Sequence, residues 1–159
     1  MADITIRRAT AVDAPALGRM GAELMRLHFA FDPQRFLDPG EQPEAGYARF
    51  LRGRLTDAEE AVFVAEQGRQ VIGYVYAGVE PLSWKELRGR AGFVHDLVVL
   101  EDARRGGVAT ALMTAAIEWL ATQKVPRVVL WAAHQNTAAQ TLFERLGFRR
   151  TMVEMTREL

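Results

Sequence analysis

The chain has 159 residues, 49% hydrophobic and 25% charged, which is enough apolar material for one sizeable core, so a single domain over residues 1–159 is expected. Twenty basic residues balance twenty acidic ones, and this neutrality disfavours a protein held to nucleic acid or to an anionic membrane by its overall charge. The absence of cysteine excludes disulfides, thiol nucleophiles and thiolate metal sites, and it fits a cytoplasmic location. Neither a signal-peptide pattern nor an apolar run long enough to span a bilayer occurs, so export and membrane insertion are not expected.

Hydrophobic periodicity and turn residues divide the first half of the chain into short elements. Thr10 and Asp13 both have N-cap chemistry and Pro15 suits a first helical turn, so either Thr10 or Asp13 can begin the first helix. Prolines and a glycine then interrupt the helical pattern, and Gly68 lies between two β-rich runs, as in a hairpin. The predicted elements are a strand at 4–8, a helix of about four turns, a loop at 31–44, a helix at 45–55 and hairpin strands at 61–66 and 70–79.

The second half of the chain places a strand, a glycine-rich turn and a helix in direct succession. Gly106 and Gly107 form the turn, and Gly147 has the position of a helix C-cap. The segment 148–159 after Gly147 alternates like a strand, and its tail at 151–159 could pair with a second chain at a sheet edge, so a monomer and a homodimer both stay open. The predicted elements are a strand at 93–100, a helix from 108, a strand at 125–133, a helix at 137–146 and the segment at 148–159.

The turn at 104–107 has the composition of a phosphate-binding site. Backbone N–H groups at a helix start have no intrahelical partners and the helix dipole adds positive charge there, so an anion can bind without net charge on the protein. Glycines allow close approach, and Arg104 and Arg105 supply mobile positive charge. Neither a Walker A loop nor a dinucleotide fingerprint is present. A plain strand-to-helix turn with two solvated arginines is the alternative.

Two motifs resemble the GNAT superfamily of N-acetyltransferases. Arg104, Gly107 and Ala109 fill the pattern Arg/Gln-x-x-Gly-x-Gly/Ala, and the segment 136–148 is similar to the family's N-x-x-A-x-x-L-Y-E-K-L-G-F ending. The resemblance covers essentially the whole chain and is weakest at 29–54. It implies an α/β (α+β) GNAT fold: a central mixed, mostly antiparallel sheet with splayed fourth and fifth strands and flanking helices.

The resemblance also implies acetyl-CoA as co-substrate. Main-chain groups of Leu97 and Val99 on the fourth strand would bond the pantetheine amides, while N–H groups of the turn would hold the pyrophosphate. Where many relatives have a tyrosine that protonates the leaving thiolate, this chain has Phe143, which has no proton to give. The cofactor-binding residues that the resemblance implies are Leu97, Val98, Val99, Arg104, Arg105, Gly106, Gly107, Val108, Ala109, Thr110, Asn136, Ala139 and Phe143.

Acetyl transfer to an amine needs a neutral nitrogen, and alkylamines are mostly protonated at neutral pH, so a base or a water relay is useful. Asp96 and His95 on the cofactor strand are the candidate catalytic residues, and Glu80 at the end of the preceding strand is a third. Since neighbouring strand residues face opposite sides, only one of Asp96 and His95 is expected to face the cleft, with Asp96 favoured. Local packing or ion pairing is the alternative role for each.

Aromatic residues after the first helix predict an acceptor pocket. By the resemblance, relatives build that pocket where this chain has His28, Phe31 and Phe36, and Trp84 from the following loop at 80–90 could cover it. Packing in the core or exposure to solvent is the alternative for these side chains. The three histidines make no spaced metal set, so no metal is predicted.

The sequence therefore predicts an enzyme that moves an acetyl group from acetyl-CoA to a primary amine of a small molecule or peptide by direct attack. A non-catalytic acyl-CoA-binding or regulatory module on the same fold is the alternative, since Phe143 replaces the usual acid and fold alone does not establish turnover. Nucleic-acid binding is a third, weaker interpretation, which the neutral charge opposes. The sequence does not identify the amine.

Overall fold

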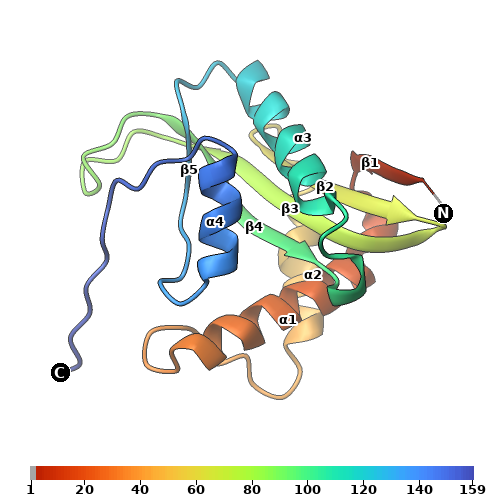
Figure 1. Ribbon diagram of the computed structural model, residues 1–159, viewed down its shortest axis with the longest axis horizontal. Helices are drawn as coiled ribbons and strands as arrows, with labels where there is room; N and C mark the ends of the chain where they lie inside the picture. The colour runs from red at the N-terminus through yellow and green to blue at the C-terminus, as the bar shows by residue number, and fades with distance from the viewer. Residues whose placement is uncertain (1–2) are drawn as a thin grey trace.

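The computed structural model describes residues 3–159, which form a five-stranded sheet with helices on both faces (Figure 1). The strands lie in chain order across the sheet, and each neighbouring pair is antiparallel except the last, which is parallel. The prediction of a mixed, mostly antiparallel sheet is therefore confirmed. The strands are β1 (Ile4–Arg8), β2 (Glu60–Gln67), β3 (Gln70–Glu80), β4 (Ala91–Val99) and β5 (Val128–Leu130).

The helices of the described chain are α1 (Ala14–Phe31), α2 (Pro43–Arg52), α3 (Val108–Thr122) and α4 (Thr137–Arg145), with short 3-10 helices η1 (Ala11–Asp13) and η2 (Glu101–Ala103). α1 and α2 cover one face of the sheet, and α3 and α4 cover the other (Figure 1). A hydrophobic core lies on each face of the sheet, and β3 contributes to both because its side chains alternate between the two faces. Tyr74 packs in the cluster that contains Leu17 of α1, and Val75 packs in the cluster that contains Leu112 of α3.

The helices and strands predicted for the first half of the chain are present, but some begin or end at other residues than predicted. Thr10 and Asp13 share the helix start, because Thr10 precedes η1, Asp13 precedes α1, and the Thr10 N–H donates to Asp13 Oδ2 at 2.7 Å. α2 begins at Pro43 rather than at residue 45, since a proline in the first helical turn loses no hydrogen bond. Gly68 and Arg69, both with positive φ, form the two-residue turn of the β2–β3 hairpin.

Two strand predictions in the second half need correction. The strand predicted at 125–133 shortens to β5, because β5 pairs with β4 only along Gly92–Val94, after which the two strands separate. This separation is the splaying that the family resemblance implied. The strand predicted at 148–159 is wrong: the segment has no strand structure, and its residues from Arg149 onward are exposed. An alternating pattern becomes a strand only beside a partner strand, and the described part of the chain places none beside it.

A bidentate ion pair joins β1 to the start of α1. Arg7 Nη1 and Nη2 donate to the two carboxylate oxygens of Asp13 at 2.8 and 2.9 Å, and Asp13 is only 6% exposed. Hydrogen bonding to the Arg7 guanidinium holds the pKa of Asp13 below its usual value, against the opposing effect of burial. A lowered folded-state pKa stabilises the fold above the unfolded-state pKa, and this stabilisation is lost as pH falls through the folded-state value.

Asp13→Asn is expected to lower the free energy of unfolding by about 2 kcal/mol at neutral pH, because the Arg7 guanidinium loses a buried charged partner. The difference from the parent protein should shrink as the pH falls through the carboxyl range, which urea titrations at several pH values would measure. Glu118→Gln, at an exposed carboxylate on α3, is the matched control and should change little at any pH. An equal loss for Asp13→Asn at acid and neutral pH would contradict the role of the ion pair.

Candidate functional site

β4 carries a β-bulge at His95. The register of β3 against β4 shifts between Tyr76 and Ala77, and His95 is the extra residue on β4. A bulge interrupts the strict alternation of a strand. The His95 ring therefore lies 4.9 Å from the Tyr76 ring, while Asp96 accepts a hydrogen bond from Tyr74 on the same face of β3. The prediction that only one of His95 and Asp96 faces the cleft is wrong, because it assumed an unbroken strand.

A small cavity of about 80 Å³ opens where β4 and the chain after β5 separate. It brings together side chains from α1, β4 and α4 that are far apart in the sequence. The predicted site residues that line it are His28, His95, Asp96, Leu97, Asn136, Ala139 and Phe143. The lining residues that sequence reasoning missed are Leu24, Val94, Leu130, Trp131, Ala132 and Ala133. For the missed residues after β5, the one available signal in the sequence was that they follow the strand expected to lie beside the fourth strand.

His95 is held between aromatic rings and a carboxylate. Its ring is stacked 5.7 Å from the Phe93 ring, and its Nε2 lies 3.2 Å from Glu80 Oε1 at the end of β3. Because a carboxylate only accepts hydrogen bonds, this contact favours the tautomer with the proton on Nε2, which leaves Nδ1 as an acceptor. The arrangement is that of an imidazole oriented by a carboxylate, which suits proton transfer.

Asp96 is a desolvated carboxylate bonded to two phenols. Its Oδ2 accepts from the Tyr47 hydroxyl at 2.5 Å and from the Tyr74 hydroxyl at 2.9 Å. Burial raises the pKa of Asp96, and the two phenol hydrogen bonds oppose that rise. Burial and the nearby Asp96 charge raise the pKa of Tyr47 and of Tyr74, so both phenols keep their protons at neutral pH. Gly21 of α1 leaves room for the Tyr47 ring, since a Cβ there would lie 2.0 Å from Tyr47 Cδ1.

The peptide groups of Leu97 and Val99 point toward the open edge of β4. The Leu100 N–H donates to the Ile72 carbonyl of β3 at 2.9 Å. Alternate residues of a strand direct their peptide groups to the same side, so Val98 also faces β3. Leu97 and Val99 then face the opposite edge, beyond the point where β5 pairs with β4. An extended ligand could bond there as a neighbouring strand would.

The turn before α3 presents a row of backbone donors. The first hydrogen bond of α3 runs from the Ala111 N–H to the Gly107 carbonyl at 3.0 Å, and within residues 3–159 the N–H groups of 106–110 meet no acceptor. Gly107 has φ +79°, and a Cβ there would meet no protein atom within 4 Å, so this side of the turn is open. Arg104 does not extend into that space, because its Nε donates to the Val99 carbonyl at 3.0 Å and ties the turn to β4.

The start of α4 forms another wall of the cavity. Asn136 caps this helix, with its Oδ1 accepting the Ala139 N–H at 3.2 Å, so the capping role and a place at the cavity coexist. Phe143 is 9% exposed, and its ring lies 6.0 Å from the Phe148 ring. Phe143 therefore shapes the cavity and packs in the core beneath α3 and α4, and it offers no proton.

The predicted acceptor cluster is assembled only in part. The rings of Phe31 and Phe36 contact the His28 ring with centroids at 5.8 and 4.9 Å, but these two phenylalanines do not line the cavity. His28 Nδ1 lies 2.8 Å from the Leu24 carbonyl and must donate to it, which leaves Nε2 as an acceptor. Trp84 lies apart in the loop after β3, with 85% of its surface exposed.

Comparison with known proteins decides the family. A sequence profile of the acetyltransferase (GNAT) family matches residues 22–148. The chain belongs to the GNAT family. Within it, the chain is 31% identical over 93 residues to a mycothiol acetyltransferase of Streptomyces griseus, a match that covers 58% of this chain and 28% of that protein. It is 31% identical over 109 residues to an N-alpha-acetyltransferase of Sulfurisphaera tokodaii, a match that covers 65% of each chain.

A solved structure shows the same GNAT fold. The aminoglycoside N-acetyltransferase AAC(6')-Iy, in complex with CoA, has a TM-score of 0.81 and 19% identity, with 100% of this chain and 96% of that chain covered. The matched regions of this GNAT chain span less than a third of the Streptomyces griseus relative and 65% of the Sulfurisphaera tokodaii relative. These comparisons establish family and fold.

The donors of this GNAT site fit the chemistry of a diphosphate joined to an amide-containing arm. Acceptor-free N–H groups before α3 suit the diphosphate, and the outward Leu97 peptide groups and Val99 N–H suit the amides, while the Val99 carbonyl already accepts from Arg104. Across residues 3–159, no group of three or more His, Cys, Asp or Glu side chains has an arrangement that could hold a metal ion. In the same part of the chain, no helix is both long and apolar enough to cross a membrane.

Gly107→Ala is expected to lower the free energy of unfolding by about 1–2 kcal/mol, because φ +79° is strained for any residue with a Cβ. The cost should be purely conformational, since the added methyl group would meet no protein atom within 4 Å. Urea unfolding measures it, with Gly89→Ala as the control, because Gly89 has equal space without a positive φ. Equal stability of the two variants would contradict the strain argument.

Proposed function

We propose that this GNAT protein is an N-acetyltransferase that moves the acetyl group of acetyl-CoA to a primary amine of a small molecule or peptide by direct attack. The observation that supports this most strongly is the order of groups along β4. Acceptor-free N–H groups follow the strand, the outward peptide groups of Leu97 and Val99 come next, and His95 and Asp96 lie beside the cavity. A pyrophosphate, a pantetheine arm and a thioester have the same order in acetyl-CoA.

In the proposed reaction, His95 accepts the proton that the amine loses as it attacks. Acetyl-CoA supplies an activated carbonyl as a thioester, and the chain supplies position and proton transfer. Glu80 holds the imidazole through Nε2, so Nδ1 is the accepting atom, directly or through one water. Asp96 is the second candidate for the base.

The surroundings of Asp96 suit an anchor for the ammonium group better than a base. Burial raises the pKa of Asp96 above its usual value, and the two phenol hydrogen bonds on Oδ2 oppose that rise and fix the orientation of the carboxylate. Among residues 3–159, Oδ1 accepts no hydrogen bond. We therefore assign Asp96 the role of holding the acceptor amine beside His95.

The departing thiolate has no assigned acid in this proposal. Phe143 cannot give a proton, and the Tyr47 and Tyr74 hydroxyls are already directed at Asp96. A thiol has a reference pKa of about 8.5, so the thiolate is a tolerable leaving group that solvent can protonate. The missing acid is also the observation that favours the alternative, a module that binds acyl-CoA without turning it over.

The acceptor is proposed only as a class. The similar proteins are named as a mycothiol acetyltransferase, an N-alpha-acetyltransferase and an aminoglycoside N-acetyltransferase, so their names do not agree on one acceptor. The cavity of about 80 Å³ admits the reacting end of such a molecule, with the remainder lying outside.

Gly107→Glu is expected to weaken CoA binding by about a hundredfold or more, because a carboxylate would point into the space proposed for the diphosphate. Isothermal titration calorimetry with CoA measures the change. Gly40→Glu is the matched control, since Gly40 has φ +68° and equal space but lies in the loop after α1. Loss of affinity in both variants, or in neither, would contradict the proposed diphosphate site.

His95→Ala is expected to lower kcat by about a hundredfold or more, and Glu80→Gln by about tenfold, with CoA affinity unchanged. Asp96→Asn should act mainly on KM for the amine. Release of free CoA thiol from acetyl-CoA, with a panel of small amines, polyamines and peptides, measures turnover, and Glu86→Gln in the exposed loop is the control. Tight CoA binding with no thiol release for any amine would overturn catalysis and favour the binding module.

A further inference from the structure

The His28 imidazole in the last turn of α1 is held in one tautomer with one nitrogen unused. Its Nδ1 donates to the Leu24 carbonyl at 2.8 Å, so the proton of the neutral ring is on Nδ1 and Nε2 is an acceptor. The Phe31 and Phe36 rings contact the imidazole edge to face, at centroid distances of 5.8 and 4.9 Å, and this packing also fixes the ring. Within residues 3–159, Nε2 has no hydrogen-bond or ion-pair partner.

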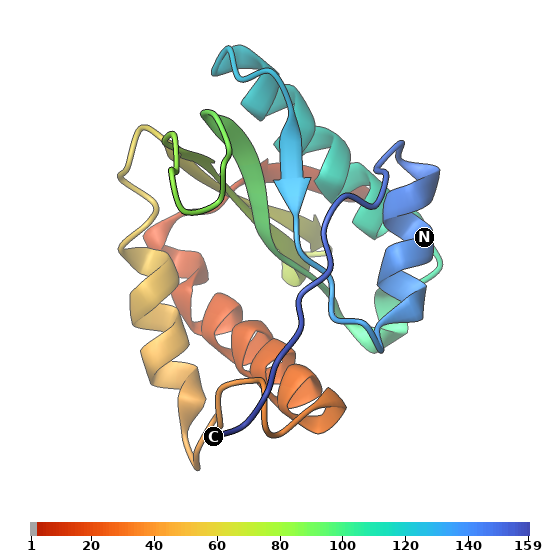
Figure 2. The same ribbon diagram turned by 90° about the vertical axis from the view of Figure 1, so that its left-hand side faces the viewer.

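This unused nitrogen belongs to a residue of the cavity between the separating strands. His28 lines the cavity together with His95 and Asp96. Burial raises the pKa of Asp96, and hydrogen bonds from two phenols and charge on His95 and His28 oppose that rise, so both imidazoles are close enough to act on the carboxylate. In Figure 2 the chain after β5 (light blue) descends toward the end of α1, and Gln135 Nε2 donates to the Phe31 carbonyl at 3.3 Å. This contact fixes the end of α1 against the segment that forms the other wall.

Three acceptor atoms without a protein partner belong to residues of this one cavity. They are His28 Nε2, His95 Nδ1 and Asp96 Oδ1, and no acceptor of these three is engaged by the described chain. On the wall formed by α4, Asn136 Oδ1 is already used by the Ala139 N–H. A space of about 80 Å³ with three unpaired acceptors suits a small group that carries several N–H donors, and an amino group is such a donor.

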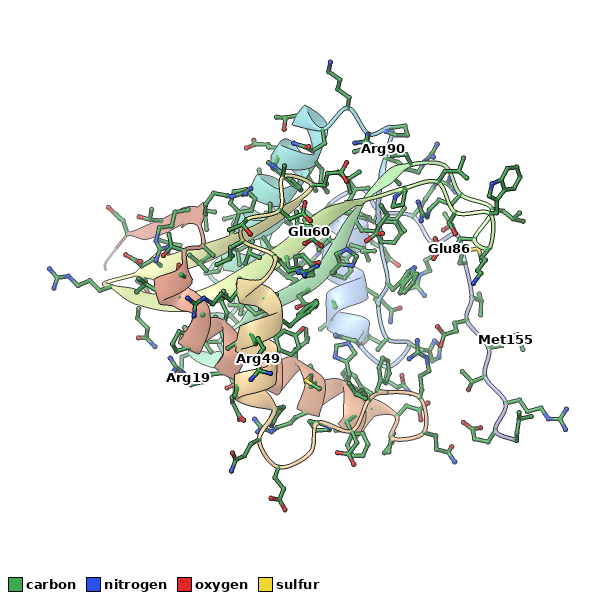
Figure 3. All side chains as sticks on the ribbon, turned by 180° about the vertical axis from the view of Figure 1, so that it is seen from behind. Arg19, Arg49, Glu60, Glu86, Arg90 and Met155 are labelled. Atoms are coloured by element: carbon green, nitrogen blue, oxygen red, sulfur yellow. The ribbon has the colours of Figure 1, made fainter. Side chains whose placement is uncertain are left out.

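The surroundings also suit the positive charge of an ammonium group. The C-terminal end of a helix carries partial negative charge, and His28 lies in the last turn of α1. Nearby arginines do not compete for the space: Arg26 donates to Glu44 at 2.6 Å, and Figure 3 shows Arg19 pointing outward near the start of the helix. An ammonium group beside Asp96 therefore meets a carboxylate and a helix end of favourable sign.

We propose that His28 makes the site selective for primary amines by accepting, at Nε2, the N–H bond that the amine keeps in the product. This inference rests on the proposed acetyl transfer. The bound ammonium first loses one proton to solvent. The nitrogen lone pair then forms the N–C bond while the C–S bond breaks, a second proton passes to His95 Nδ1, and the thiolate takes a proton from solvent. The last N–H stays on the nitrogen as the amide N–H, on His28.

A secondary amine or an alcohol cannot satisfy both imidazoles. In its neutral form each has a single N–H or O–H, and His95 must take that proton during the attack. His28 Nε2 is then left without a donor, and an unfilled acceptor in a desolvated site lowers both affinity and rate. His28 is therefore a specificity-determining residue for the class of acceptor.

His28→Phe keeps a ring between Phe31 and Phe36 but removes the acceptor. With butylamine, kcat/KM from the release of CoA thiol is expected to fall at least about tenfold, and with N-methylbutylamine it should stay within about threefold. His28→Gln, which can place an amide oxygen near the position of Nε2, should recover most of the loss. His134→Phe, at an exposed histidine outside the cavity, is the matched control and should change neither value. Equal losses for the two amines would show a purely structural role and overturn the proposal.

A binding measurement separates this inference from the proposed transfer. The full chain, labelled at histidine and with CoA bound, is titrated with N-butylacetamide, which resembles a product and cannot react. Nitrogen NMR is expected to show a shift of His28 Nε2 with this amide and none with N-methyl-N-butylacetamide, which has no N–H. The spectrum of His28→Gln assigns the signal.

The two ideas fail in different ways. No shift of the His28 signal with either amide, or the same shift with both, would overturn the role of His28 whatever the turnover. A shift with N-butylacetamide alone, without CoA thiol release from acetyl-CoA for any amine, would support the N–H contact at His28 and overturn the acetyl transfer.

Discussion

The bulge at His95 is the feature on which the rest of the candidate site depends. One extra residue on β4 turns two consecutive side chains to the same face, which a regular strand cannot do. It also coincides with the end of pairing to β5, since Val94 is the last β4 residue in that register. A single interruption in the ladder therefore creates a gap between strands and places an imidazole and a carboxylate beside it.

Both faces of the sheet support this arrangement. On the α1 side, the absence of a side chain at Gly21 lets Tyr47 approach, and its hydroxyl fixes Asp96 together with Tyr74. On the other side, α3 packs through Leu112 and begins at a turn whose backbone donors have no protein acceptor. The candidate site thus has two parts, an imidazole and a carboxylate held by side-chain contacts and a turn with free backbone donors.

Backbone groups supply many of the hydrogen-bond donors of the candidate site. Arg104 is bonded to the Val99 carbonyl, and the peptide N–H groups and the helix dipole add positive character to the turn beside the charges of Arg104 and Arg105. A neutral protein can in this way hold an anion without a basic surface.

The sequence by itself determined the order of the elements, the family motifs and the turn before α3, because periodicity, caps and glycines are local signals. It also identified His95, Asp96, Asn136 and Phe143 as neighbours of one site through the resemblance to the family. Only the tertiary structure decided that His95 and Asp96 share a face, that β5 stops at Leu130, and that 148–159 forms no strand. These outcomes depend on which strand lies beside which, and pairing between distant segments leaves no local trace in the sequence.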